Sequence, residues 1–83
     1  MINYKEARDR AIRIIQQILI NKKKSFTKSD LSKFCHLHPI VLSQISDILI
    51  NEGFCQLFNT EDFEITSQGI HMALINRAKF IPF

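Results

Sequence analysis

The chain has 83 residues, which is enough for one hydrophobic core but leaves too few residues for a second. Hydrophobic residues make up 46% of the sequence, with only two glycines and two prolines, which excludes a disordered or low-complexity chain and favours one ordered, mainly helical domain. The formal net charge is +3, and its distribution is more informative than its size.

Positive and negative charges are separated along the sequence. Residues 1–33 contain nine of the eleven Lys and Arg residues and three of the eight acids, which gives this segment a charge of +6. Residues 34–76 contain the other five acids and no Lys or Arg, which gives −5, and Arg77 and Lys79 follow. Such asymmetry is typical of an interaction surface.

The cysteines and the N-terminal region indicate the compartment. Cys35 and Cys55 do not make a disulfide framework, and two thiols in a domain with its own core fit a reducing environment. No secretion signal is visible, and the apolar stretch 14–20 is interrupted by Gln16 and Gln17, so it is too short and too polar to span a bilayer. We therefore expect a cytoplasmic protein without a membrane partner.

Apolar spacings of three and four predict a first helix over residues 4–21. Its expected core face consists of Tyr4, Ala7, Ala11, Ile14, Ile15 and Ile18. Ile12, Leu19 and Ile20 widen the apolar stripe beyond one face, so they are available to a second helix of the same chain or of a partner.

Two further helices are predicted over residues 28–35 and 39–52. Thr27 is placed to cap the first of them, and Asp30 three residues later suggests a capping box. Pro39 fits the first position of the next helix, where its missing N–H costs nothing, and Gly53 fits the position after its end. Leu42, Ile45, Ile48 and Leu49 form the expected core face of this third helix.

After Gly53 the apolar period changes to two, which predicts a β-hairpin over residues 54–66. Phe54, Phe58 and Phe63 are the expected core anchors of this hairpin. A final helix is predicted over residues 67–77, capped by Thr66 or Ser67, and the ending Lys79-Phe80-Ile81-Pro82-Phe83 is more apolar than a free tail.

This order of elements, together with three segments, resembles the winged helix-turn-helix family. The segments are 26–39 (FTKSDLSKFCHLHP), 45–54 (ISDILINEGF) and 63–69 (FEITSQG), and the resemblance covers about residues 4–77. It implies a single α+β, mainly helical domain over residues 1–83, with three to four helices and one two-stranded hairpin.

The resemblance also implies a binding face, because the family commonly places its third helix in the DNA major groove and its wing on the DNA backbone. By position, the base-reading residues would be His38, Ile40, Val41, Ser43, Gln44 and Asp47, and the wing would be residues 59–64. This sequence departs from that pattern, since neither region contains Lys or Arg and the wing carries Glu61, Asp62 and Glu64, which phosphates repel.

Two hypotheses follow. In the first, a small regulator of transcription binds double-stranded DNA with its basic N-terminal third, while Ser43 and Gln44 still read bases. The cations of that surface are Lys22, Lys23, Lys24, Lys28 and Lys33. In the second, the fold is a protein–protein interaction module or inhibitor whose acidic and apolar third helix and wing bind a protein. We favour DNA, because the family commonly binds it.

A homodimer is a further expectation, motivated by apolar residues beyond the needs of one core. They are Ile12, Leu19 and Ile20 in the first helix and Phe80, Ile81 and Phe83 at the end of the chain.

Metal and catalytic sites are not expected. Cys35-His36-Leu37-His38, with Cys55 and His71 elsewhere, contains ligand types that zinc uses, but no second paired motif completes a tetrahedral set. No glycine-rich phosphate loop is present, and two cysteines and three histidines arise easily by chance. We therefore predict a protein that is not an enzyme and has no cofactor.

Overall fold

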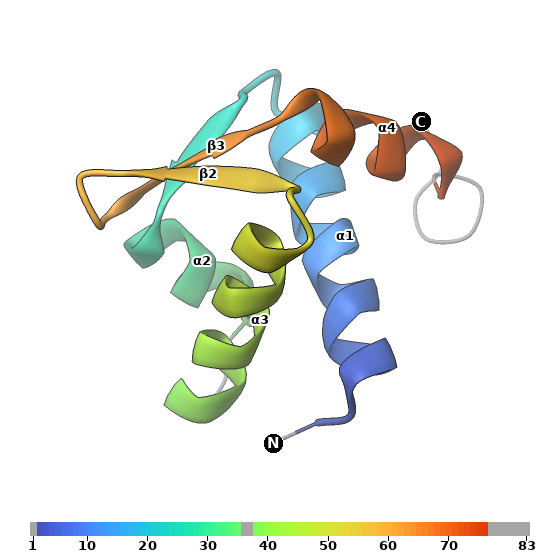
Figure 1. The fold of residues 1–83 in the computed structure, drawn as a ribbon. Coiled ribbons are helices and arrows are strands. Elements are labelled where there is room, and N and C mark those ends of the chain that lie inside the picture. Colours follow the sequence, from blue (N-terminus) through green and yellow to red (C-terminus); the bar gives the residue numbers. More distant parts are fainter. Residues whose placement is uncertain (1, 36–37, 77–83) are drawn as a thin grey trace.

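A small antiparallel sheet covers one end of a group of helices in the computed structural model, which describes residues 2–35 and 38–76 (Figure 1). In this part of the chain there are four helices and three strands, so the expected α+β, mainly helical class is confirmed. The elements in order are α1 (Tyr4–Ile20), β1 (Ser25–Thr27), α2 (Lys28–Cys35), α3 (Pro39–Asn51), β2 (Cys55–Phe58), β3 (Asp62–Ile65) and α4 (Ser67–Ile75).

The sheet has a strand that the sequence analysis missed. The expected two-stranded hairpin of β2 and β3 is present, but β1 also pairs with β3, so the sheet has three strands in the order β1-β3-β2. Phe26 lies opposite Phe63, and the backbone N–H of Ile65 donates to the Lys24 carbonyl at 2.8 Å. A three-residue strand is too short to show a period of two, and its partner lies almost forty residues away.

Caps mark the beginnings of α2, α3 and α4 at the residues that the sequence indicated. Thr27 and Asp30 each accept a hydrogen bond from the other's backbone N–H, both at 3.1 Å. Pro39 begins α3, and Gly53 follows that helix with a φ of +76°. The Thr66 hydroxyl accepts from the Gly69 N–H at 3.1 Å and caps α4. The helix α2 ends at residue 35 as predicted, α1 and α3 end one residue before the predicted bounds and α4 ends two before, and residue 77 lies outside the described residues.

The core lies where α1 packs against both α3 and α4 beneath the sheet. Because α1 has helices on two sides, it needs a wide apolar stripe, and Ile12 is buried in the core at 1% exposure. The expectation that Ile12 faces a partner is therefore wrong. Tyr4, expected in the core face, is instead 54% exposed, and Phe58 is 46% exposed while Phe54 and Phe63 are fully buried.

A polar cluster holds the beginning of α1 against the end of α3. The Tyr4 hydroxyl and the Arg8 guanidinium both donate to the Glu52 carboxylate, and the Arg8 Nε–Glu52 Oε1 distance is 3.3 Å. The Arg8 guanidinium also lies 5.5 Å from the centre of the buried Phe54 ring. The hydrogen bond from Tyr4, aided by Arg8, lowers the pKa of Glu52.

In the described part of the chain, no helix is long and apolar enough to cross a membrane.

Candidate nucleic-acid interface

Exposed lysines gather where α1 passes into β1 and α2. We define the basic corner as Lys22, Lys23 and Lys24 in the turn after α1 together with Lys28 and Lys33 of α2, all of which are exposed. The pairing of β1 with β3 fixes both ends of this corner, because Lys24 and Lys28 each use a backbone group to bond with the β3 side of the sheet. Lys22 has a φ of 61°, which tightens the turn.

One acid, Asp30, lies within the basic corner. Its carboxylate is 3.8 Å from the Lys33 ammonium, in an exposed pair that contributes little to stability. The backbone N–H of Thr27 is the main cause of a lowered pKa at Asp30, and the charges of Lys33 and Lys23 lower it further. Lys23 and Lys33 therefore act on the same carboxylate although ten residues separate them. The sequence prediction that these lysines form one surface is consistent with this placement.

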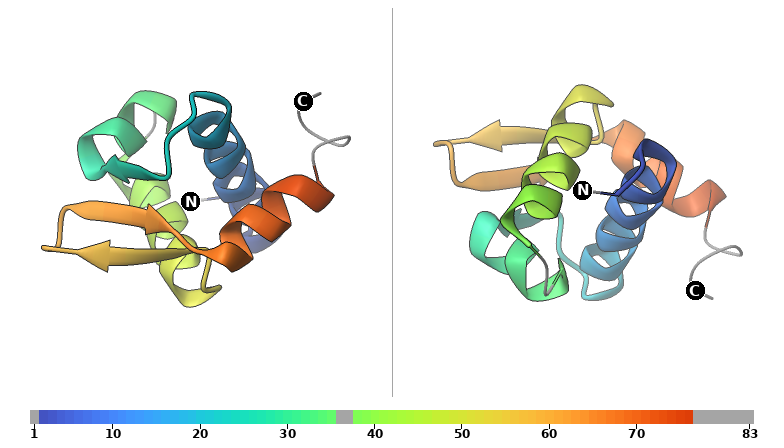
Figure 2. Two further views of the ribbon diagram at one scale, coloured as in Figure 1. Left: turned by 90° about the horizontal axis from the view of Figure 1, so that it is seen from above. Right: turned by 90° about the horizontal axis from the view of Figure 1, so that it is seen from below.

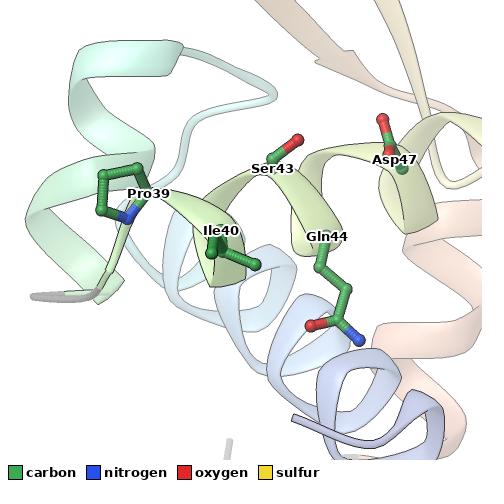
Figure 3. A pocket seen from close by; sticks show the side chains of 5 residues that line it. All are labelled: Pro39, Ile40, Ser43, Gln44 and Asp47. Carbon is green, nitrogen blue, oxygen red and sulfur yellow. The ribbon is translucent and has the colours of Figure 1, made fainter. Parts of the chain in front are cut away.

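The exposed side of α3 forms a second surface. An open hollow on it is lined by Pro39, Ile40, Ser43, Gln44 and Asp47 (Figure 3). A groove between α2 and α3 is lined by Lys28, Leu31, Pro39, Leu42, Ser43, Ser46 and Asp47. Lys28 thus belongs to the basic corner and also borders the side of α3. Ser46 was not predicted, although its position three residues after Ser43 places it on the same side of the helix.

Some of the predicted base-reading residues of α3 are exposed to solvent, and others are buried or hydrogen-bonded within the domain. His38, Ile40 and Ser43 are exposed, and Ile40 is 49% exposed. Val41 is 6% exposed and belongs to the core, so its predicted role in base reading is wrong. It lies on the core-facing side of α3, which is wider than the sequence analysis assumed. The Gln44 amide donates to the Ile2 carbonyl at 2.7 Å and accepts from the Ile2 N–H at 3.3 Å.

The hairpin bears the negative charge that the sequence analysis noted. Glu61 and Glu64 are exposed and Asp62 is half-buried, and Asp62 and Glu64 share the outer side of the sheet because buried Phe63 between them faces the core. The turn after α1 and the beginning of α3 lie at opposite ends of the molecule (Figure 1). The structure therefore brings Lys28 to α3 but leaves Lys22, Lys23 and Lys24 apart from His38 and Ile40.

The residues proposed for a dimer surface differ in their exposure to solvent. Ile12 is buried, Leu19 is half-buried against the core, and Ile20 is 41% exposed. Phe80, Ile81 and Phe83 lie outside the described residues. Of the predicted dimer surface on α1, Ile20 is the residue that presents a large exposed area.

In comparisons with known proteins, no family model, curated protein or solved structure matches the chain. Over residues 2–35 and 38–76, no group of three or more His, Cys, Asp or Glu side chains is arranged to hold a metal ion.

Proposed function

We propose that the chain is a winged-helix domain that binds double-stranded DNA through phosphate contacts of the basic corner. The observation that carries the proposal is the gathering of five exposed lysines around β1 and α2. Asp30 lies among them, and Asp62 and Glu64 of β3 lie opposite Thr27 and Ser25 of β1. Lysines that neutralise phosphates release counterions, and this release supplies much of the affinity for DNA.

The arrangement of the elements supports the winged-helix part of the proposal. A short α2 is followed by α3 and then by the β2–β3 hairpin, which is the order that the resemblance implies. The helix α2 begins inside the basic corner, so the positive pole of its dipole lies beside Lys28, whereas Lys33 lies in the last turn of the helix. The domain would act as a small regulator of transcription.

The acidic hairpin determines how DNA would lie on the domain. Docking through α3 and the hairpin together would place Glu61 and Glu64 against phosphates and would be repulsive. We therefore propose that DNA approaches from α2 and the turn after α1, with Ser43 at the margin of the contact through the groove that it shares with Lys28.

The test is the salt dependence of binding to a fluorescently labelled duplex, measured by anisotropy. Each phosphate contact adds about 0.9 to the slope of log K against log salt. Replacing Lys23 and Lys24 by Gln is expected to weaken binding and to reduce that slope by about 1.8. The matched control is Lys5→Gln with Arg10→Gln, which removes the same charge from α1, where both cations pair with acids of the same helix.

The two double variants distinguish a local contact from a general effect of net charge. Equal losses of affinity in both would show that net charge alone determines binding. If the wild-type protein binds no duplex at low salt, the DNA proposal is wrong.

A second candidate function, binding of a protein, is favoured by a different observation. Ile40 is 49% exposed in the hollow that it shares with Asp47, and α3 contains no Lys or Arg. Partner capture from host extract with nuclease present tests it. The substitution Ile40→Asp should abolish capture and leave DNA binding unchanged. If nuclease treatment of the wild-type sample removes the captured protein, the capture depends on nucleic acid and the protein-binding proposal is wrong.

A further inference from the structure

We infer that β2 is a dimerisation edge, at which a second copy of this chain adds its own β2 in antiparallel orientation. The strand order β1-β3-β2 leaves β2 at one border of the sheet, and the view from above shows it as the outer strand of the hairpin (Figure 2). This inference does not depend on DNA binding.

The two borders of the sheet differ in how they are protected against pairing. Natural sheets guard their edges with short strands, lysines, prolines or bulges. The β1 border has three residues and is preceded by Lys22, Lys23 and Lys24. The β2 border has the sequence Cys-Gln-Leu-Phe, without a charge or a proline, and it exposes 43% of Leu57 and 46% of Phe58.

The hydrogen-bond alternation identifies the free backbone groups of β2. The Thr66 N–H donates to the Phe54 carbonyl at 3.0 Å, in line with the register that pairs Gln56 with Glu64. Hydrogen-bonded and non-hydrogen-bonded pairs alternate in an antiparallel ladder, so Gln56 and Phe58 direct their backbone groups toward β3. The N–H and C=O of Leu57 therefore point to the open border.

A second copy is the occupant that fits this border. Two-fold pairing centred on Leu57 lets the two Leu57 residues exchange both backbone hydrogen bonds, and it places Phe58 of each copy beside Gln56 of the other. No charged side chain meets another directly. The acids of the two β3 strands would be about 14 Å apart, at three strand spacings, which exceeds the screening length of about 8 Å at physiological salt.

Sedimentation velocity over a rising protein concentration tests the dimer. The contact is smaller than a standard interface, so we expect association weaker than about micromolar. Leu57→Lys places a charge on the border and should leave a monomer throughout. The matched control is Ile75→Lys on α4, where the original side chain is 60% exposed, and it should dimerise like the wild type.

Amide hydrogen exchange gives a second readout that needs no variant. The Leu57 amide should exchange quickly in dilute protein and slow at least several-fold as the concentration rises, while the Gln56 and Phe58 amides stay protected throughout. A wild-type chain that remains monomeric, with a rapidly exchanging Leu57 amide at every concentration, overturns the inference. So does a dimer that survives Leu57→Lys.

Discussion

Phe26 of β1 stacks on Phe63 of β3, with ring centroids 5.0 Å apart and ring planes 9° apart. The two residues lie opposite each other in the strand register, and both are buried. Phe26 lies between Lys24 and Lys28, two residues from each, so this contact also fixes both parts of the basic corner against the sheet.

Removing the stacked ring of Phe26 should destabilise the fold. Phe26→Leu keeps an apolar side chain but loses the stacked ring, and we expect the free energy of unfolding to fall by about 1–2 kcal/mol. Phe58→Leu is the control, since Phe58 is 46% exposed and its replacement should change stability by less than about 0.5 kcal/mol. Urea unfolding measures both, and similar losses in the two variants would show that the stack is not special.

Features encoded by neighbouring residues were predictable from the sequence. The capping box of Thr27 and Asp30, Pro39 at the start of α3 and the left-handed Gly53 after it all lie where the sequence placed them. Each depends on residues within one helical turn, so the chemistry of the side chains is enough to locate them.

Features that depend on distant partners were not predictable. The strand β1 exists because Phe26 meets Phe63, and neither its length nor its local pattern indicates a strand. The sequence analysis assigned Ile12 to a partner surface and Val41 to base reading, but each helix packs against more than one neighbour and buries them. For the proposed binding surface, the lysines are visible in the sequence, while the placement of Lys23 and Lys33 near Asp30 required the fold.

Gly69 is expected to be the less replaceable of the two glycines. A Cβ at Gly69 would lie 2.3 Å from the Phe54 carbonyl oxygen and 2.9 Å from Ile65 Cγ2, so the backbone would have to shift. A Cβ at Gly53 meets nothing within 4 Å, and the cost there is the φ of +76°. Gly53→Ala should cost about 1 kcal/mol and Gly69→Ala about 2–3 kcal/mol.

Thermal unfolding separates the two glycine variants. In a domain of this size, 1 kcal/mol corresponds to about 4–8 °C in Tm, so the difference between them is measurable. A larger drop in Tm for Gly53→Ala would mean that helix α4 moves away from Phe54 at little cost.

The thiol of Cys55 should be inert in the folded protein. Cys55 is 3% exposed, and burial raises its pKa to about 12, so almost no thiolate exists near neutral pH. With Cys35 replaced by Ser, a disulfide reagent should label Cys55 at the rate of unfolding and become fast in urea. Rapid labelling without denaturant would show that β2 opens locally.

Glu52 should make the stability of the domain depend on acid pH. The hydrogen bond from Tyr4 and the pairing with Arg8 hold the pKa of Glu52 below its ordinary value of 4.5. A carboxyl whose folded pKa is lowered stabilises the fold above its unfolded pKa, and this contribution disappears as the pH falls through the folded pKa. The effect is therefore complete at pH 7, begins to decrease near the ordinary pKa of 4.5 and is lost once the pH is below the lowered pKa of the folded state.

Glu52→Gln tests this linkage. At pH 7 the variant should melt a few degrees below the wild type, because the joint between α1 and α3 loses its charge-assisted hydrogen bonds. As the pH is lowered, the wild type should lose its advantage and the two melting curves should converge. Glu61→Gln removes the same charge from the exposed hairpin turn and should melt close to the wild type at pH 7. A gap between Glu52→Gln and the wild type that is equally wide at pH 3 and pH 7 would show that the side chain acts through its shape and not through its charge.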